Sequence, residues 1–300
     1  MGKLCSKQSQ DANSFFQNEP EIKIISYKND DDKFFENIEN KFNYFHKILF
    51  VDYLHSLVNF SSENATLEEK YENMTLEYSM NDAFFTELFT SDYFQSFLEN
   101  KILKHKALYS EAGGNEKATS IFKEAFMEMS KGLSLKLSQD AKSKGDEGAD
   151  QNNIIKKRDT LAFGILYCIG PNSNKVKALF NIFKQDDVVK PCDNLSDFLL
   201  SLFIIPSYGI ISARNKLSKC DEIGPIEKED LKSLLTFAEL KNCQSLVQIT
   251  NKLLFGEDLS KTLDEVDWNK KFAEKTRDES LAFLLSPAGV RYMLKKNNNK

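Results

Sequence analysis

The stretch GEDLSKTLDEVDW, residues 256–268, decides the fold that we expect for this chain. It contains the aliphatic residue Leu263, followed four places on by Asp267 and at once by the large apolar residue Trp268. Apolar residues at helical spacing lie before and after the stretch, which predicts two helices joined by a loop of twelve residues.

The same pattern occurs three more times in the chain. It is complete in IEKEDL at 226–231 and in ILFVDY at 48–53, and it lacks the aliphatic residue in DNLSDF at 193–198. An alternative interpretation is that each copy marks only the start of a helix, where an acidic residue precedes an apolar one. The repetition favours helix–loop–helix units with these loops: 41–52, 186–197, 219–230 and 256–267.

The rest of the chain also has helical rather than strand periodicity. Phe122, Phe126 and Met129, for example, recur at intervals of four and three, and alternation over five or more residues is almost absent. We therefore expect an all-α fold. Residues 138–153, SQDAKSKGDEGADQNN, carry no large apolar side chain and read as a linker. The predicted organisation is a flexible arm (1–33), an N-terminal helical lobe with one unit (34–137), the linker (138–153) and a C-terminal lobe with the other units (154–300).

The helix–loop–helix units resemble degenerate EF-hands of the acylated calcium-sensor type, similar to recoverin and calcineurin B. The resemblance is clearest in KCDEIGPIEKED, residues 219–230, where Asp221, Gly224, Ile226 and Asp230 stand at loop positions 3, 6, 8 and 12. In that family position 8 pairs with the partner loop, position 12 is an acid and position 13 opens the apolar face of the second helix. The family implies an array of paired helices whose apolar faces bind an amphipathic partner helix.

Loop 256–267 has the best supply of calcium ligands. Asp258, Ser260, Asp264 and Asp267 stand at positions 3, 5, 9 and 12, whereas Lys261 occupies the position of the turn glycine. We predict a weak calcium site here at most, and otherwise no cofactor.

The other three loops place cations or apolar groups where ligands belong. Loop 186–197 keeps Asp186 and Asp197 at its ends but has Lys190 at position 5. Lys219 and Lys41 stand at position 1 of the loops at 219–230 and 41–52. We expect these loops to persist for helix packing, without calcium.

The chain begins MGKLCSK, which fits the N-myristoylation pattern M-G-x-x-x-[ST]. Gly2 would carry the myristoyl group, and Cys5 is a candidate for palmitoylation. One acyl chain gives only marginal membrane binding, so two together are needed for stable attachment. We expect a peripheral protein on the cytosolic face of a membrane.

Composition excludes other classes of function. The net charge is −5, which argues against nucleic acid as a partner. The five cysteines form no C-x-x-C pair, as is usual in a reducing compartment. Common phosphate-binding, zinc-protease and nucleophile motifs are absent, so we expect no enzymatic activity. Basic side chains are nearly all lysine, since the only arginines are Arg158, Arg214, Arg277 and Arg291.

The sequence leaves three hypotheses of function. The first is a non-catalytic, acylated adaptor that binds a partner helix largely without calcium. The second is a calcium sensor that uses loop 256–267. The third is a structural protein of the cytoskeleton or a cilium.

Overall fold

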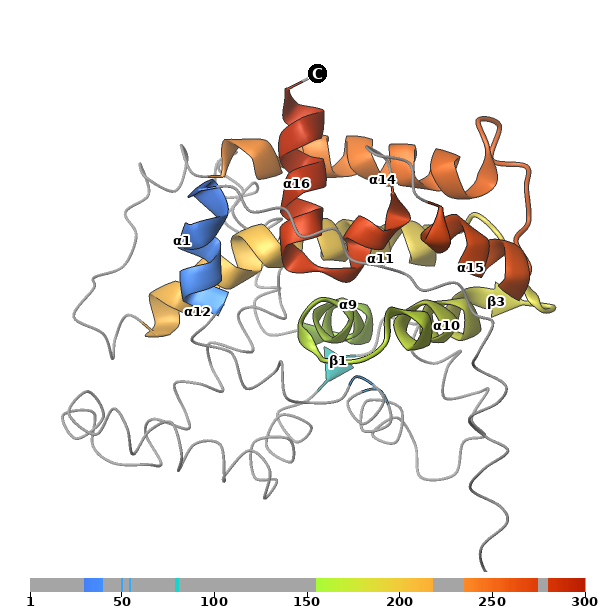
Figure 1. Cartoon of the computed structure of the whole chain (residues 1–300), viewed down its shortest axis with the longest axis horizontal. Helices are drawn as coiled ribbons and strands as arrows, with labels where there is room; N and C mark the ends of the chain where they lie inside the picture. The colour runs from blue at the N-terminus through green and yellow to red at the C-terminus, as the bar shows by residue number, and fades with distance from the viewer. Residues whose placement is uncertain are drawn as a thin grey trace, which may run out of the picture.

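The structure is a computed structural model that describes residues 30–39, 50, 54, 79–80, 155–217, 235–274 and 280–299. These residues are mostly helical, which confirms the expected helical class for this part of the chain (Figure 1). The acylation positions Gly2 and Cys5, the linker 138–153 and the loop 219–230 lie outside the described residues. Of the loop 41–52, only Phe50 is described.

The helices and strands follow one another along the chain in this order: α1 (Asp30–Glu39), β1 (Ser79–Met80), β2 (Ile155–Lys156), α9 (Lys157–Tyr167), α10 (Asn172–Phe183), β3 (Lys184–Gln185), β4 (Val188–Val189), α11 (Asp193–Ile204), η4 (Ile205–Gly209), α12 (Ile210–Leu217), η6 (Thr236–Ala238), α14 (Leu240–Phe255), α15 (Glu265–Ala273), η7 (Leu281–Leu285) and α16 (Pro287–Asn298). The strands form two short antiparallel pairs, β1 with β2 and β3 with β4.

Helices α11 and α12 are joined by η4, a π-helical turn that contains Pro206. Proline has no N–H and its ring clashes with the carbonyl one turn earlier, so a regular α-helix is disfavoured here. The Ser207 hydroxyl donates to the Ile204 carbonyl at 3.0 Å, which satisfies one of the carbonyls near the break. The helix therefore continues through the proline with a wider turn.

One helix in the described part of the chain, Asp193–Asn215, is long and apolar enough to cross a membrane by length and composition alone. Its most apolar window is 72% buried inside the protein. Such burial is typical of the central helix of a protein core.

The core joins both ends of the chain. Phe35 and Ile38 of α1 are buried in the same apolar cluster as α9, α11, α14 and α16. Phe50 is also buried, and its N–H donates to the Ile169 carbonyl at 2.6 Å. Residues from the predicted N-terminal lobe thus complete the core of the C-terminal helices.

Helix α1 begins at Asp30, inside the segment that the sequence assigned to the flexible arm, 1–33. Its first residues are Asp30, Asp31 and Asp32. Part of the segment predicted as an arm is therefore helical.

Candidate functional site

The loops that follow α10 and α14 are joined by backbone hydrogen bonds. The Val189 N–H donates to the Leu263 carbonyl at 2.8 Å, and the Leu263 N–H donates to the Val189 carbonyl at 3.0 Å. Both residues are buried. Leu263 stands at position 8 of loop 256–267, the position expected to pair with a partner loop.

Each helix that flanks one of these loops packs against a helix that flanks the other loop. Helix α10 contacts α15, and α11 contacts α14. The Trp268 indole N–H of α15 donates to the Val176 carbonyl of α10 at 3.0 Å. The Asn251 amide of α14 donates to the Ser196 hydroxyl of α11 at 3.0 Å. Each helix–loop–helix unit is therefore held by its loop and by both of its helices.

The loop after α10 lies earlier than the window 186–197. It contains the hairpin of β3 and β4, whose turn residues Asp186 and Asp187 have φ values of 52° and 59°. The pairing residue is Val189, whereas the window placed Asp193 at position 8. Helix α11 already begins at Asp193, because Pro191 favours extended backbone before it and Cys192 is the extended N-cap residue.

Asp197 consequently lies within α11 rather than at the end of a loop. Its carboxylate accepts from the Arg158 guanidinium at 2.5 Å. Asp159, next to Arg158 and fully buried, accepts from the Ser201 hydroxyl at 2.5 Å. These polar contacts fasten α9 to α11, and Asp186 lies in the turn between β3 and β4.

Loop 256–264 is internally bonded. The Asp258 carboxylate accepts from the Ser260 backbone N–H at 3.3 Å. Hydrogen bonds from the Ser260 side chain and backbone, together with the charge of Lys261, lower the pKa of this exposed Asp258. Glu257 pairs with Lys252 at 2.7 Å. The acidic side chains of this loop thus have partners within the protein.

The backbone of this loop turns at a different place from a calcium-binding EF-hand loop. The left-handed residues are Gly256 (φ 88°) and Leu259 (φ 54°), at positions 1 and 4. Lys261, which replaces the turn glycine at position 6, is not among the left-handed residues. The sharp turn that aims the ligands of a calcium loop is therefore displaced.

Asp264 begins α15 as its N-cap. Its carboxylate accepts from the Asp267 backbone N–H at 2.8 Å, and the exposed Asp267 lies in the first helical turn. Within the described ranges, no three His, Cys, Asp or Glu residues lie together as a group that could hold a metal ion. Calcium binding by Asp258, Ser260, Asp264 and Asp267 stays a prediction.

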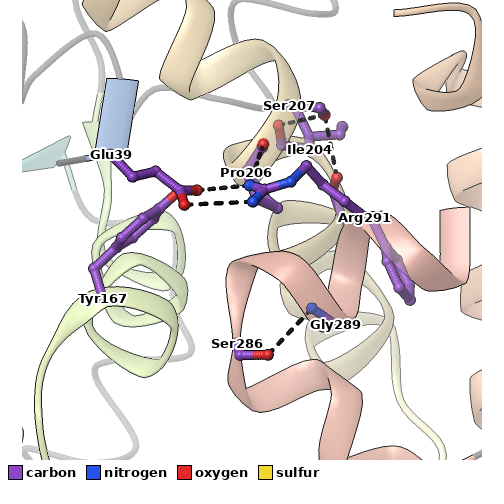
Figure 2. Close-up of polar contacts among 9 residues, drawn as sticks. Glu39, Tyr167, Ile204, Pro206, Ser207, Ser286, Gly289 and Arg291 are labelled. Atoms are coloured by element: carbon purple, nitrogen blue, oxygen red, sulfur yellow. Dashed lines mark hydrogen bonds and ion pairs between the residues drawn. The ribbon is translucent and has the colours of Figure 1, made fainter. Parts of the chain in front are cut away.

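A second polar centre lies where α1, α9, η4 and α16 meet (Figure 2). The Arg291 guanidinium binds both carboxylate oxygens of Glu39, at 2.6 Å through Nη1 and 3.3 Å through Nη2. Nη1 also donates to the Pro206 carbonyl at 3.2 Å, and the Tyr167 hydroxyl donates to Glu39 Oε1 at 3.2 Å. We call these four residues the Arg291 centre.

Apolar groups enclose the Arg291 centre. The guanidinium carbon lies 4.7 Å from the centre of the Phe35 ring, and that ring meets Phe237 edge-on at 6.2 Å. Arg291 is fully buried. Burial, and then the charge of Glu39, raise the pKa of Tyr167 well above its usual value, so the phenol remains a proton donor.

No sequence motif marks the Arg291 centre. Glu39 and Arg291 are separated by most of the chain, and no local motif links them. One signal was present: Arg291 is a rare arginine in a lysine-rich chain and lies in the mainly apolar run VRYML, residues 290–294. A buried arginine is favoured over lysine where a carboxylate must be bound through two hydrogen bonds.

Cys168 and Lys175 are two further buried titratable residues, and burial shifts the pKa of each. The Lys175 ammonium donates to the Ile165 carbonyl at 2.6 Å. Burial lowers the pKa of Lys175 to about 8 and raises that of Cys168 to about 12. Because a thiol with a raised pKa is a poor nucleophile, the buried Cys168 acts as a small core residue.

No protein-family model, no curated protein and no solved structure matches this chain.

Proposed function

We propose that this protein is a non-catalytic, membrane-anchored adaptor with EF-hand-like helix pairs, which binds a partner helix largely without calcium. The observation that carries the proposal is the two-way backbone pairing of Val189 and Leu263. Paired loops of this kind, with crosswise helix packing, are what the resemblance to EF-hand proteins implies for a pair of units.

The contacts inside the loops support the metal-free form of this proposal. Asp258 is bonded to Ser260, Glu257 to Lys252, and Asp264 to the start of α15. A calcium ion would have to replace these contacts and draw in six to eight oxygens. The packing of α10, α11, α14 and α15 needs no such ion, because Trp268 and Asn251 bond across the helix pairs.

Membrane attachment follows from the N-terminal sequence. Gly2 and Cys5 would supply two acyl chains, and Lys3 and Lys7 can approach anionic headgroups. The adaptor would thereby hold its partner at the cytosolic face of a membrane.

The experiment is sedimentation with vesicles of phosphatidylcholine and phosphatidylserine. The full chain is co-produced with an N-myristoyltransferase and compared with Gly2→Ala, in a calcium chelator and in micromolar calcium. We expect a larger fraction of the wild-type chain than of Gly2→Ala to sediment in both conditions, because the myristoyl group adds to the weak attraction of Lys3 and Lys7 for phosphatidylserine. Sedimentation in calcium alone would favour the calcium sensor. Equal behaviour of the two chains would favour the structural protein of the cytoskeleton or cilium.

A further inference from the structure

Helix α1 is bound to the body of the protein through one face. Phe35 and Ile38 are buried, whereas Lys33 and Glu36 on the same helix are exposed. The helix packs against α12, and Figure 1 shows the two beside each other. Helix α1 thus has the division into apolar and polar faces of an amphipathic helix bound to a surface.

The surface beneath α1 presents a guanidinium group and an aromatic ring to that helix. Arg291 offers a planar pair of donors that match a carboxylate, and Glu39 fills it. Phe237 and the face of the guanidinium both contact the ring of Phe35. Phe35 and Glu39 are four residues apart, so they lie on the same side of the helix. The surface therefore recognises an aromatic residue followed, one turn later, by a glutamate.

Helix α1 is short. It has only 10 residues, and a helix of that length is marginal on its own in water. Its order comes from the surface that it covers. If α1 left, Arg291 would lose the carboxylate of Glu39, and a buried cation demands a replacement carboxylate.

We propose that α1 is an intramolecular ligand of this surface, and that the partner inserts a helix with the same aromatic-x-x-x-Glu pattern in its place. The proposal rests on the proposed function, in which the partner supplies a helix. It adds the chemistry of that helix and the competition from α1 that keeps the surface covered until the partner binds.

The test uses a fluorescein-labelled synthetic peptide, NDDDKFFENIENK, with the sequence of residues 29–41. Its binding to the full chain is measured by fluorescence anisotropy without calcium or membranes. The double variant Phe35→Ala/Glu39→Gln, which weakens the hold of α1, is compared with wild type and with the control Glu36→Gln on the exposed face. We expect the double variant to bind the peptide at least tenfold more tightly than the other two chains.

A peptide with the Glu39→Gln change should bind the double variant at least tenfold more weakly than the native peptide. A peptide with Glu36→Gln should bind like the native one. Equal affinity of the native peptide for all three chains, or no binding to any of them, would overturn the proposal. Because calcium and vesicles are absent, this failure is distinguishable from failure of the vesicle experiment.

Hydrogen exchange on the wild-type chain gives a second test that needs no substitution. We expect the α1 amides to exchange at least tenfold faster than those of α11 and α14, through an opening that leaves the other helices folded. Exchange of α1 at the same rate as α11 would show that it opens only with the whole core, and would overturn the proposal.

Discussion

Val189 and Leu263 pair through both of their backbone hydrogen bonds, at 2.8 and 3.0 Å, and join two loops from distant parts of the chain. Leu263 is nearly fully buried beneath this bridge and Val189 is completely so. Buried backbone groups without a partner cost free energy, so the two residues stabilise each other's position. The bridge fixes how the α10–α11 unit meets the α14–α15 unit.

Replacing Leu263 with proline should test the bridge. Proline removes the N–H that binds the Val189 carbonyl, while Leu263→Ala removes only side-chain packing. We expect the proline variant to be less stable than the alanine variant by about 1–3 kcal/mol, the cost of an unsatisfied buried carbonyl. Urea denaturation measures the difference; equal stability of the two variants would show that the bridge contributes nothing.

Asp264→Ala should lower stability by about 1 kcal/mol, because it removes the N-cap of α15. Asp264→Asn is the matched control, since an asparagine side chain caps equally well without the negative charge. The expected order in thermal unfolding is Asp264→Asn close to wild type and Asp264→Ala lower, with or without a calcium chelator. Loss of stability in Asp264→Asn that appears only with calcium would instead assign Asp264 to an ion.

Arg291→Met should destabilise the protein by about 3–5 kcal/mol, because Glu39 is left buried without its cation. The double variant Arg291→Met/Glu39→Gln should recover part of that loss, since the remaining amide is neutral. The two variants and Glu39→Gln complete a double-mutant cycle, measured by urea denaturation. Additive effects of the two substitutions would contradict a direct interaction.

Lys175 should make stability increase with pH between about 8 and 9. Its pKa is about 8 in the folded protein because of burial, against 10.5 in an unfolded chain. The unfolded state therefore holds more protons in this range, and the free energy of unfolding rises with pH by at most about 1.4 kcal/mol per unit. Above pH 9 the raised pKa of Cys168 acts in the opposite direction.

The comparison that isolates Lys175 is denaturation at pH 7, 8 and 9 of wild type, Lys175→Met and Lys177→Met. Lys177 lies on the same helix but is exposed. The increase should disappear in Lys175→Met and persist in Lys177→Met. A similar slope in all three chains would assign the pH dependence to other groups.

The helical class and a loop between helices within 256–267 could be predicted because they depend on local patterns, although Glu265–Asp267 already belong to α15. Leu263 forms the backbone bridge to Val189, and Asp267 lies in the first turn of α15. Trp268 is the buried residue that bonds α15 to α10. At Asp197 and Phe198 the same pattern lies within α11, which begins four residues earlier, at Asp193. Local spacing alone cannot distinguish these two cases.

The Arg291 centre could not be predicted, because it depends on contacts between residues that are far apart in sequence. The acidic run at 30–32 suggested a solvated arm, but it begins a helix whose Phe35 lies in the core and whose Glu39 is buried against Arg291. Only the three-dimensional placement of Arg291 explains why a glutamate is buried there.

The central claim is that the paired loops hold the helices together without binding calcium. Isothermal titration calorimetry of calcium into the full chain tests this claim most directly. Asp258→Asn serves as the matched variant, since it removes a ligand charge from an exposed position of loop 256–267. We expect no saturating heat at micromolar calcium in either chain. A saturating heat in the wild-type chain that is lost in Asp258→Asn would contradict it.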